Sequence, residues 1–217
     1  MKRSVDWGLY LVTDRQLSAP RTIEETVKAA LPGGVSVVQL REKDGTTREF
    51  LLLALRLLTI LRPAGVPLII NDRLDVAIAA GADGVHLGQS DLPYREARSI
   101  LGPEAIIGLS VETLEQAREA EEWDIDYLAA SPVFSTPTKT DTGPAWGLAG
   151  LFSLRKLTRH PLVAIGGINR TNAASVLQAG ADGIAVVSAL CAAPDPGAEA
   201  KYLREIIEQV RREGNRP

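Results

Sequence analysis

Ala80-Gly81-Ala82-Asp83-Gly84-Val85 recurs later in the chain as Ala179-Gly180-Ala181-Asp182-Gly183-Ile184. Each copy leads from a helical pattern into a short β-rich run, and glycine is the usual residue just past the end of a helix. The two copies therefore mark the same helix-to-strand junction in a repeated unit. We expect their Asp-Gly pairs to lie at the bottom of a barrel and to take no part in chemistry.

Short β-rich runs alternate with longer helical patterns along the whole chain, which is typical of a parallel sheet. The expected strands are Gly8–Thr13, Val35–Arg41, Pro67–Asn71, Gly84–Leu87, Ala105–Leu109, Tyr127–Ala130, Leu162–Ile165 and Gly183–Val187. The clearest helix runs from Thr46 to Leu61, with apolar residues along one broad face. The last helix covers about 198–212, and a polar tail at 213–217 is expected to fray.

Eight such units in 217 residues predict a (β/α)8 TIM barrel formed by one domain, residues 1–217, because no linker or shift in composition divides the chain. The alternative is an open doubly wound sheet. That fold would carry a Gly-x-Gly-x-x-Gly fingerprint after its first strand, where this chain has Thr13-Asp14-Arg15-Gln16.

Composition narrows the classes of function. A net charge of −3 argues against a nucleic-acid or membrane-surface partner. The single cysteine, Cys191, excludes an intramolecular disulfide and is expected to be a small buried hydrophobe. Neither a secretory signal nor a membrane span is visible, so we expect a cytoplasmic protein. The oligomeric state stays open, a homo-oligomer included.

Polar clusters follow the expected strands at the ends where barrel enzymes hold their sites. In Gln39-Leu40-Arg41-Glu42-Lys43 the odd-numbered side chains share one face, which can point into the barrel mouth. An Arg fork and a mobile ammonium two residues apart suit a phosphate group. The alternative interpretation is a solvated strand end with a salt bridge.

Asp72 and Asp91, in two neighbouring loops, are candidate Mg²⁺ ligands, because Mg²⁺ favours one or two carboxylates plus water and phosphate oxygens. Each could instead cap a helix, Asp72 one that begins near Arg73 and Asp91 one near Pro93. His86 lies within a strand and is expected to be packed rather than catalytic.

Two further segments suggest anion contacts. Thr136, Thr138 and Lys139 lie in a long loop rich in Pro, Thr and Gly, which is typical of a functional lid. Gly166-Gly167 follows one strand and Ser188 ends the next, where barrels often bind phosphate, although a Gly-Gly pair is also a common turn.

Together these clusters resemble the thiamine phosphate synthase family over nearly the whole chain. The matching stretches are Gln39–Lys43, Asn71-Asp72-Arg73, Gly81–Gly88 with Asp91, Gly108-Leu109-Ser110, Pro132–Lys139, Ala164–Ile168 and Ala185–Ser188. The resemblance implies a Mg²⁺-dependent transferase of thiamine biosynthesis. It would condense hydroxymethylpyrimidine pyrophosphate with thiazole phosphate to give thiamine phosphate and pyrophosphate, through a pyrimidine-stabilised carbocation.

The resemblance also implies a role for each site residue. The pyrimidine pyrophosphate would be held by Gln39, Leu40, Arg41, Glu42, Lys43, Asn71, Ser110 and Lys139. The thiazole phosphate would be held by Thr136, Pro137, Thr138, Gly167, Val187 and Ser188. Asp72 and Asp91 would bind Mg²⁺, and the residues acting in catalysis would be Arg41, Lys43, Ser110 and Lys139.

The sequence departs from the commonest family pattern at Ser90, where an acid is frequent, and at Thr140, where proline is frequent. Neither change removes an expected contact. Two rival functions remain: a metal-independent thiazole tautomerase of the same fold, and a barrel that binds a phosphate ligand without catalysis.

Overall fold

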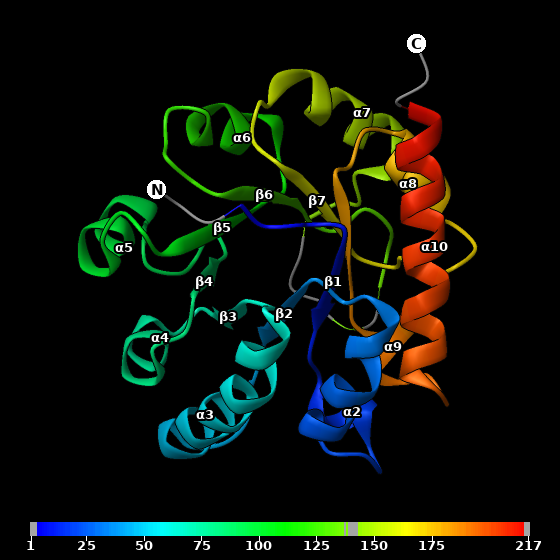
Figure 1. Cartoon of the computed structure of the whole chain (residues 1–217). Helices are drawn as coiled ribbons and strands as arrows, with labels where there is room; N and C mark the ends of the chain where they lie inside the picture. Colours follow the sequence, from blue (N-terminus) through cyan, green and yellow to red (C-terminus); the bar gives the residue numbers. More distant parts are fainter. Residues whose placement is uncertain (1–3, 137, 139–142, 215–217) are drawn as a thin grey trace.

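Eight parallel strands close into a barrel in this computed structural model, which describes residues 4–136, 138 and 143–214 (Figure 1). The strands are β1 (Leu9–Val12), β2 (Val37–Leu40), β3 (Leu68–Asn71), β4 (Gly84–Leu87), β5 (Ile106–Val111), β6 (Tyr127–Ala130), β7 (Leu162–Ile165) and β8 (Gly183–Val186). Each strand pairs with its neighbour in sequence, and β8 returns to β1. The predicted (β/α)8 barrel is confirmed, and every expected strand overlaps an observed one.

Helices surround the barrel. They are α1 (Arg15–Ser18), α2 (Ile23–Ala30), α3 (Thr47–Ala64), α4 (Leu74–Ala80), α5 (Tyr94–Leu101), α6 (Leu114–Ala120), α7 (Gly147–Leu157), α8 (Ala173–Gln178), α9 (Ser188–Cys191) and α10 (Pro196–Gly214), with a 3-10 turn, η1, at Leu31–Gly33. No helix in the described part of the chain combines the length and the apolarity that crossing a membrane requires.

The two ends of helix α3 are fixed by local interactions of its capping residues. It begins at a capping box in which Thr46 and Glu49 satisfy each other's backbone N–H groups. It ends at Gly65, which adopts a left-handed conformation with φ of 68°. The helix therefore continues through Pro63 to Ala64, three residues beyond the predicted end at Leu61, and Gly65 stops it.

Side chains along each strand point alternately outward and inward, and they form two packed layers. Outward-facing side chains such as Leu11, Leu40 and Val85 join the large core between the sheet and the helices. Inward-facing side chains such as Tyr10 and Tyr127 fill the barrel itself. The inner layer closes the barrel below and leaves the carboxyl ends of the strands open, where the site lies.

Candidate active site

A cavity of about 450 Å³ opens at the carboxyl ends of the strands. It is lined by all but four of the residues that the sequence assigns to substrates or metal: Gln39, Arg41, Lys43, Asn71, Asp72, Asp91, Ser110, Thr136, Thr138, Gly167, Val187 and Ser188. Two of the remaining four, Pro137 and Lys139, lie outside the described residues. The other two, Leu40 and Glu42, do not line the cavity.

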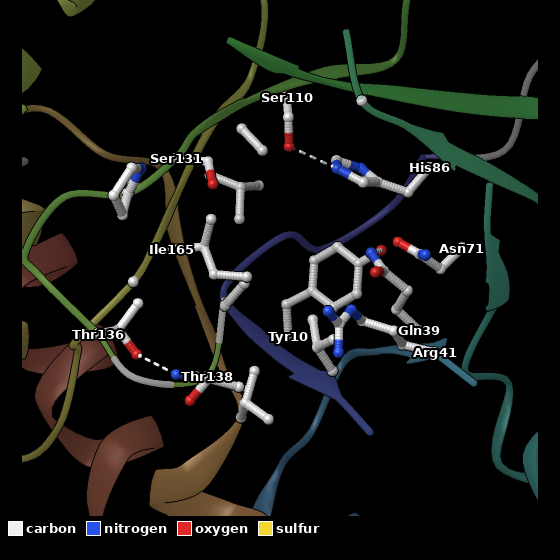
Figure 2. Close-up of a pocket in the computed structure, with 18 of the residues that line it drawn as sticks. Tyr10, Gln39, Arg41, Asn71, His86, Ser110, Ser131, Thr136, Thr138 and Ile165 are labelled. Atoms are coloured by element: carbon white, nitrogen blue, oxygen red, sulfur yellow. Dashed lines mark hydrogen bonds between the residues drawn. The ribbon is translucent and has the colours of Figure 1, made fainter. Parts of the chain in front are cut away.

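The end of β2 divides its side chains between two faces. Gln39 and Arg41 point into the barrel mouth, as Figure 2 shows, and Lys43 lines the same cavity. Leu40 is fully buried in the core between sheet and helices, and Glu42 forms an ion pair with Arg15. The predicted shared face of the three odd positions is confirmed. Strand alternation turns the side chains of Leu40 and Glu42 away from the cavity, so their assignment to the pyrimidine substrate stays a prediction.

Arg41 offers an unused donor to this cavity. Its backbone N–H donates to Thr13 Oγ1 at 3.1 Å, but its buried Nη2 has no hydrogen-bond partner among the described residues. A buried guanidinium nitrogen without an acceptor is costly. An anionic ligand in the mouth would supply that acceptor.

Asp72 and Asp91 meet on the same rim, at the ends of β3 and β4. Neither caps a helix: the N-cap residues of α4 and α5 are Arg73 and Pro93, and neither helix has a side-chain cap. Asp91 Oδ2 instead accepts a hydrogen bond from Gly88 N at 2.6 Å, and Asp72 takes a left-handed backbone with φ of 61°. The capping alternative is therefore wrong for both residues.

The two carboxylates interact strongly. Burial, followed by the hydrogen bond and charge of Asp91, raises the pKa of Asp72 from 3.8 to about 6. The described residues hold no cluster of three or more His, Cys, Asp or Glu side chains that could bind a metal. A carboxylate pair on the same cavity as Arg41 still fits Mg²⁺, because this ion completes its shell with water and phosphate oxygens.

The loops after β6 and β7 form the opposite wall of the cavity. Val133 N and Phe134 N donate to Ile165 O and Gly166 O at 2.8 and 3.1 Å. Gly167 has φ of 65°, and a Cβ there would lie 2.9 Å from Phe134 Cβ. Glycine is required at this position because both the backbone conformation and the close packing exclude a side chain.

The phosphate-binding elements that the sequence predicts meet on this wall. Gly166 and Gly167 line the cavity together with Ser188, the first residue of the short helix α9. Thr136 and Thr138 lie close by, and Thr138 N donates to Thr136 Oγ1 at 3.2 Å (Figure 2). The cavity therefore has a cationic and carboxylate end near β2 to β4, and a glycine and hydroxyl end near β6 to β8.

Several polar side chains that the sequence did not assign to a substrate or a metal also line the cavity. Among them are Tyr10, His86, Gln89, Glu112, Tyr127 and Ser131. His86 is buried, as expected, but it also faces the cavity and hydrogen-bonds to Ser110 (Figure 2). Strand alternation could have shown that Tyr10 and Tyr127 point inward, but it could not show how high in the barrel each one lies.

Glu112 connects the cavity to the loop that follows β6. Its Oε2 accepts from Gly143 N at 3.0 Å, and Trp146 Nε1 donates to Val111 O at 3.1 Å. Both contacts fasten the far end of this loop to the end of β5. The long loop is therefore anchored at residues 143–146, beside the rim of the cavity.

Comparison with known proteins bears directly on this site. A family model described as thiamine monophosphate synthase matches residues 9–190. A thiamine-phosphate synthase of Albidiferax ferrireducens is 59% identical over 202 residues, 93% of this chain and 92% of the relative. One of Syntrophomonas wolfei is 58% identical over 204 residues, 94% of this chain and 98% of the relative. The solved thiamine phosphate pyrophosphorylase of Pyrococcus furiosus superposes with a TM-score of 0.86 at 42% identity, covering 94% of this chain and 97% of that one.

Proposed function

Because the chain belongs to the thiamine monophosphate synthase family and acts as a thiamine-phosphate synthase, we propose how its cavity carries out that reaction. Hydroxymethylpyrimidine pyrophosphate and thiazole phosphate bind side by side. The bond between the pyrimidine methylene carbon and the pyrophosphate oxygen breaks, and a carbon–nitrogen bond forms to the thiazole ring. The observation that carries this proposal is one cavity with two chemically different ends.

The pyrophosphate group takes the end near β2. Arg41 Nη2, buried and without a partner among the described residues, would donate to a phosphate oxygen, and Lys43 adds a second cation. Negative charge grows on the pyrophosphate as it departs. Cations fixed in the mouth before the reaction therefore stabilise the transition state more than the bound substrate.

Asp72 and Asp91 would hold Mg²⁺ between the protein and the pyrophosphate. When bound, the ion supplies positive charge to the leaving group. The positive charge of the ion would also offset the repulsion between the two carboxylates, which contributes to the raised pKa of Asp72.

The thiazole phosphate takes the end near β7 and β8. Gly167, Val187 and Ser188 line that end, and Thr136 and Thr138 face it. The thiazole nitrogen attacks with a free lone pair, so this step needs no general base. His86 fits that requirement, since its two ring nitrogens already contact Tyr127 and Ser110.

The test is incubation of the protein with both substrates, with and without Mg²⁺, while thiamine phosphate and pyrophosphate are measured. We expect equal amounts of both products, and only with Mg²⁺ present. Isomerisation of thiazole phosphate alone, without metal, would instead indicate the tautomerase activity. Binding of either substrate without any turnover would indicate a binding protein. We also propose that the reaction takes place in the cytoplasm, which localisation of the tagged chain would test.

A further inference from the structure

A chain of hydrogen bonds crosses the floor of the cavity and joins four strands to Ser110. Gln39 Nε2 donates to Tyr10 Oη at 3.0 Å, and Tyr10 Oη lies 2.8 Å from Tyr127 Oη. Tyr127 Oη lies 2.8 Å from His86 Nδ1, and His86 Nε2 lies 2.9 Å from Ser110 Oγ. The reaction outlined above gives Tyr10, Tyr127 and His86 no direct part.

Tyr127 is held firmly at the centre of this chain. Its side chain is fully buried, and its ring centroid lies 4.5 Å from that of Trp7. A Cβ at Gly108 would come within 2.0 Å of Tyr127 Cζ, so a glycine in β5 provides the space for the ring. The Tyr127 ring can therefore pass over β5 to reach His86 on β4, because β5 has no side chain at this level.

The inventory of donors fixes the direction of the chain. Each tyrosine hydroxyl has one proton, and a neutral imidazole has one N–H. Since Gln39 donates to Tyr10, Tyr10 can donate to Tyr127, Tyr127 to His86 Nδ1, and His86 Nε2–H to Ser110. In the reverse direction Tyr10 would have to donate to the Gln39 amide, but the amide nitrogen, itself a donor, faces Tyr10 Oη in this structure.

The environment supports neutral, protonated phenols. Burial raises the pKa of Tyr10, and burial together with the neighbouring Tyr10 raises the pKa of Tyr127 well above 10. Both hydroxyls therefore keep their protons near neutral pH. In the forward direction the Ser110 oxygen receives a hydrogen bond from His86, and its own proton is left to point into the cavity.

We propose that Tyr127 and His86 are positioning residues that hold the Ser110 hydroxyl as a hydrogen-bond donor toward the pyrimidine substrate. Tyr127 locks the His86 imidazole in the Nε2–H tautomer, and His86 then fixes Ser110. A hydroxyl oriented in advance loses less rotational freedom when substrate binds. Two experiments test this proposal. The kinetic measurement depends on the proposed function, and the NMR measurement of the tautomer does not.

The tautomer can be measured directly, because the chain has only two histidines, His86 and His160. Two-bond ¹H–¹⁵N NMR spectra of the histidine-labelled free protein distinguish the two neutral tautomers from the imidazolium. We expect the Nε2–H form at His86 in the wild type and a mixture of tautomers in Tyr127→Phe. His160 should give the same signals in both proteins, which shows that the variant is folded. An Nδ1–H or doubly protonated His86 in the wild type would overturn the proposal without any variant.

The kinetic test asks whether Tyr127 acts through Ser110. Tyr127→Phe should lower kcat/KM for the pyrimidine pyrophosphate about tenfold while the KM for thiazole phosphate stays unchanged. In a Ser110→Ala background the same substitution should change kcat/KM by less than about twofold. Equal losses in both backgrounds would mean that Tyr127 acts only through the fold, and would contradict the proposal.

A matched pair at His86 completes the design. Glutamine places an amide nitrogen near the position of Nε2, whereas asparagine places one near Nδ1. His86→Gln should therefore keep at least about tenfold more kcat/KM than His86→Asn. Equal activity of the two variants would overturn the role of the Nε2–H group. A wild-type protein that does not turn over both substrates would refute the proposed function and leave the tautomer result standing.

Discussion

At the scale of single residues, the carboxylate of Asp72 and the backbone of Gly167 each have a specific role in the cavity. Asp72 carries a carboxylate next to Asp91 on a backbone with positive φ. Gly167 combines a positive φ with contact against the neighbouring loop. Both lead to substitutions whose effects have a definite sign.

Asp72→Asn should stabilise the metal-free protein and remove most of its activity. The folded pKa of about 6 lies above the ordinary 3.8, so the stability contributed by Asp72 is fully present below about pH 4 and is lost as the pH rises through 6. The variant should therefore unfold at a higher temperature than the wild type at pH 7.5 with EDTA, and this gain should shrink at pH 5. Because Asp72 is only partly buried and solvent screens its charge, we expect a gain of about 1 kcal/mol or less.

With Mg²⁺ present, the wild type should unfold at a higher temperature than Asp72→Asn. The wild type should gain thermal stability and the variant should gain less, with turnover reduced on the order of 10²-fold. Asp75→Asn is the matched control, because the hydrogen bond from Arg73 lowers the pKa of Asp75, which lies outside the cavity. That control should lose a little stability at pH 7.5 and keep its activity. Full Mg²⁺-dependent turnover in Asp72→Asn would refute the metal assignment.

Gly167→Ala and Arg41→Ala should separate the two ends of the cavity. The added Cβ at Gly167 meets Phe134, so we expect the KM for thiazole phosphate to rise about tenfold, equivalent to about 1.4 kcal/mol of binding. Arg41→Ala should instead lower kcat/KM for the pyrimidine pyrophosphate. Gly81→Ala is the control: its φ of 64° is close to that of Gly167, but the new Cβ would make only an ordinary contact, 3.6 Å from Arg62 Nη2. Steady-state kinetics that show both substrates equally affected by both site variants would contradict the division.

At the scale of elements, aspartates at the bottom of the barrel fasten the starts of the strands. Asp83 Oδ2 accepts from Leu68 N at 2.8 Å, and Asp182 Oδ2 accepts from Leu162 N at 2.8 Å. In each case the Asp before one strand binds the first residue of the neighbouring strand. The repeat that the sequence assigns to the barrel bottom therefore has a structural purpose, and its expected distance from the chemistry is confirmed.

Asp83→Ala should lower stability without changing turnover. The substitution leaves the N–H of Leu68 without its acceptor, at a cost of about 1–2 kcal/mol. For a chain of this size that corresponds to a fall in Tm of about 2–4 °C for each kcal/mol. Asp83→Asn keeps an oxygen acceptor and should lose less. Thermal unfolding and steady-state kinetics check both parts, and a fall in kcat in the properly folded variant would contradict the structural role.

At the scale of the whole molecule, the barrel closes where the first and last elements meet. Strand β1 pairs with β8, and helix α10 lies along the outside of this junction (Figure 1). Asp6, just before β1, binds Arg204 and Arg211 of α10. One acidic side chain therefore links the two ends of the described chain.

Asp6→Asn should weaken this closure in a pH-dependent way. Burial alone would raise the pKa of Asp6, but hydrogen bonds from Arg204, Gly8 N and Arg211 outweigh it and lower the pKa. The stabilisation is therefore present above about pH 4 and is lost as the pH falls below the ordinary value of 3.8. The loss at pH 7 should be at most about 1 kcal/mol, because Asp6 is partly exposed, and should fade below pH 4. Unfolding curves at both pH values check this, with the exposed Glu205→Gln on α10 as the control; an equal loss at both would contradict it.

The sequence by itself determined the number and order of the strands and the face shared by Gln39, Arg41 and Lys43. Both follow from local periodicity, since alternation and helix-end glycines act over a few residues. Only the tertiary structure decided that Asp72 faces Asp91, or that Tyr127 reaches His86 across the space beside Gly108. These contacts join residues on different strands at one height in the barrel. That height depends on how the closed sheet staggers its strands, and no local pattern encodes the stagger.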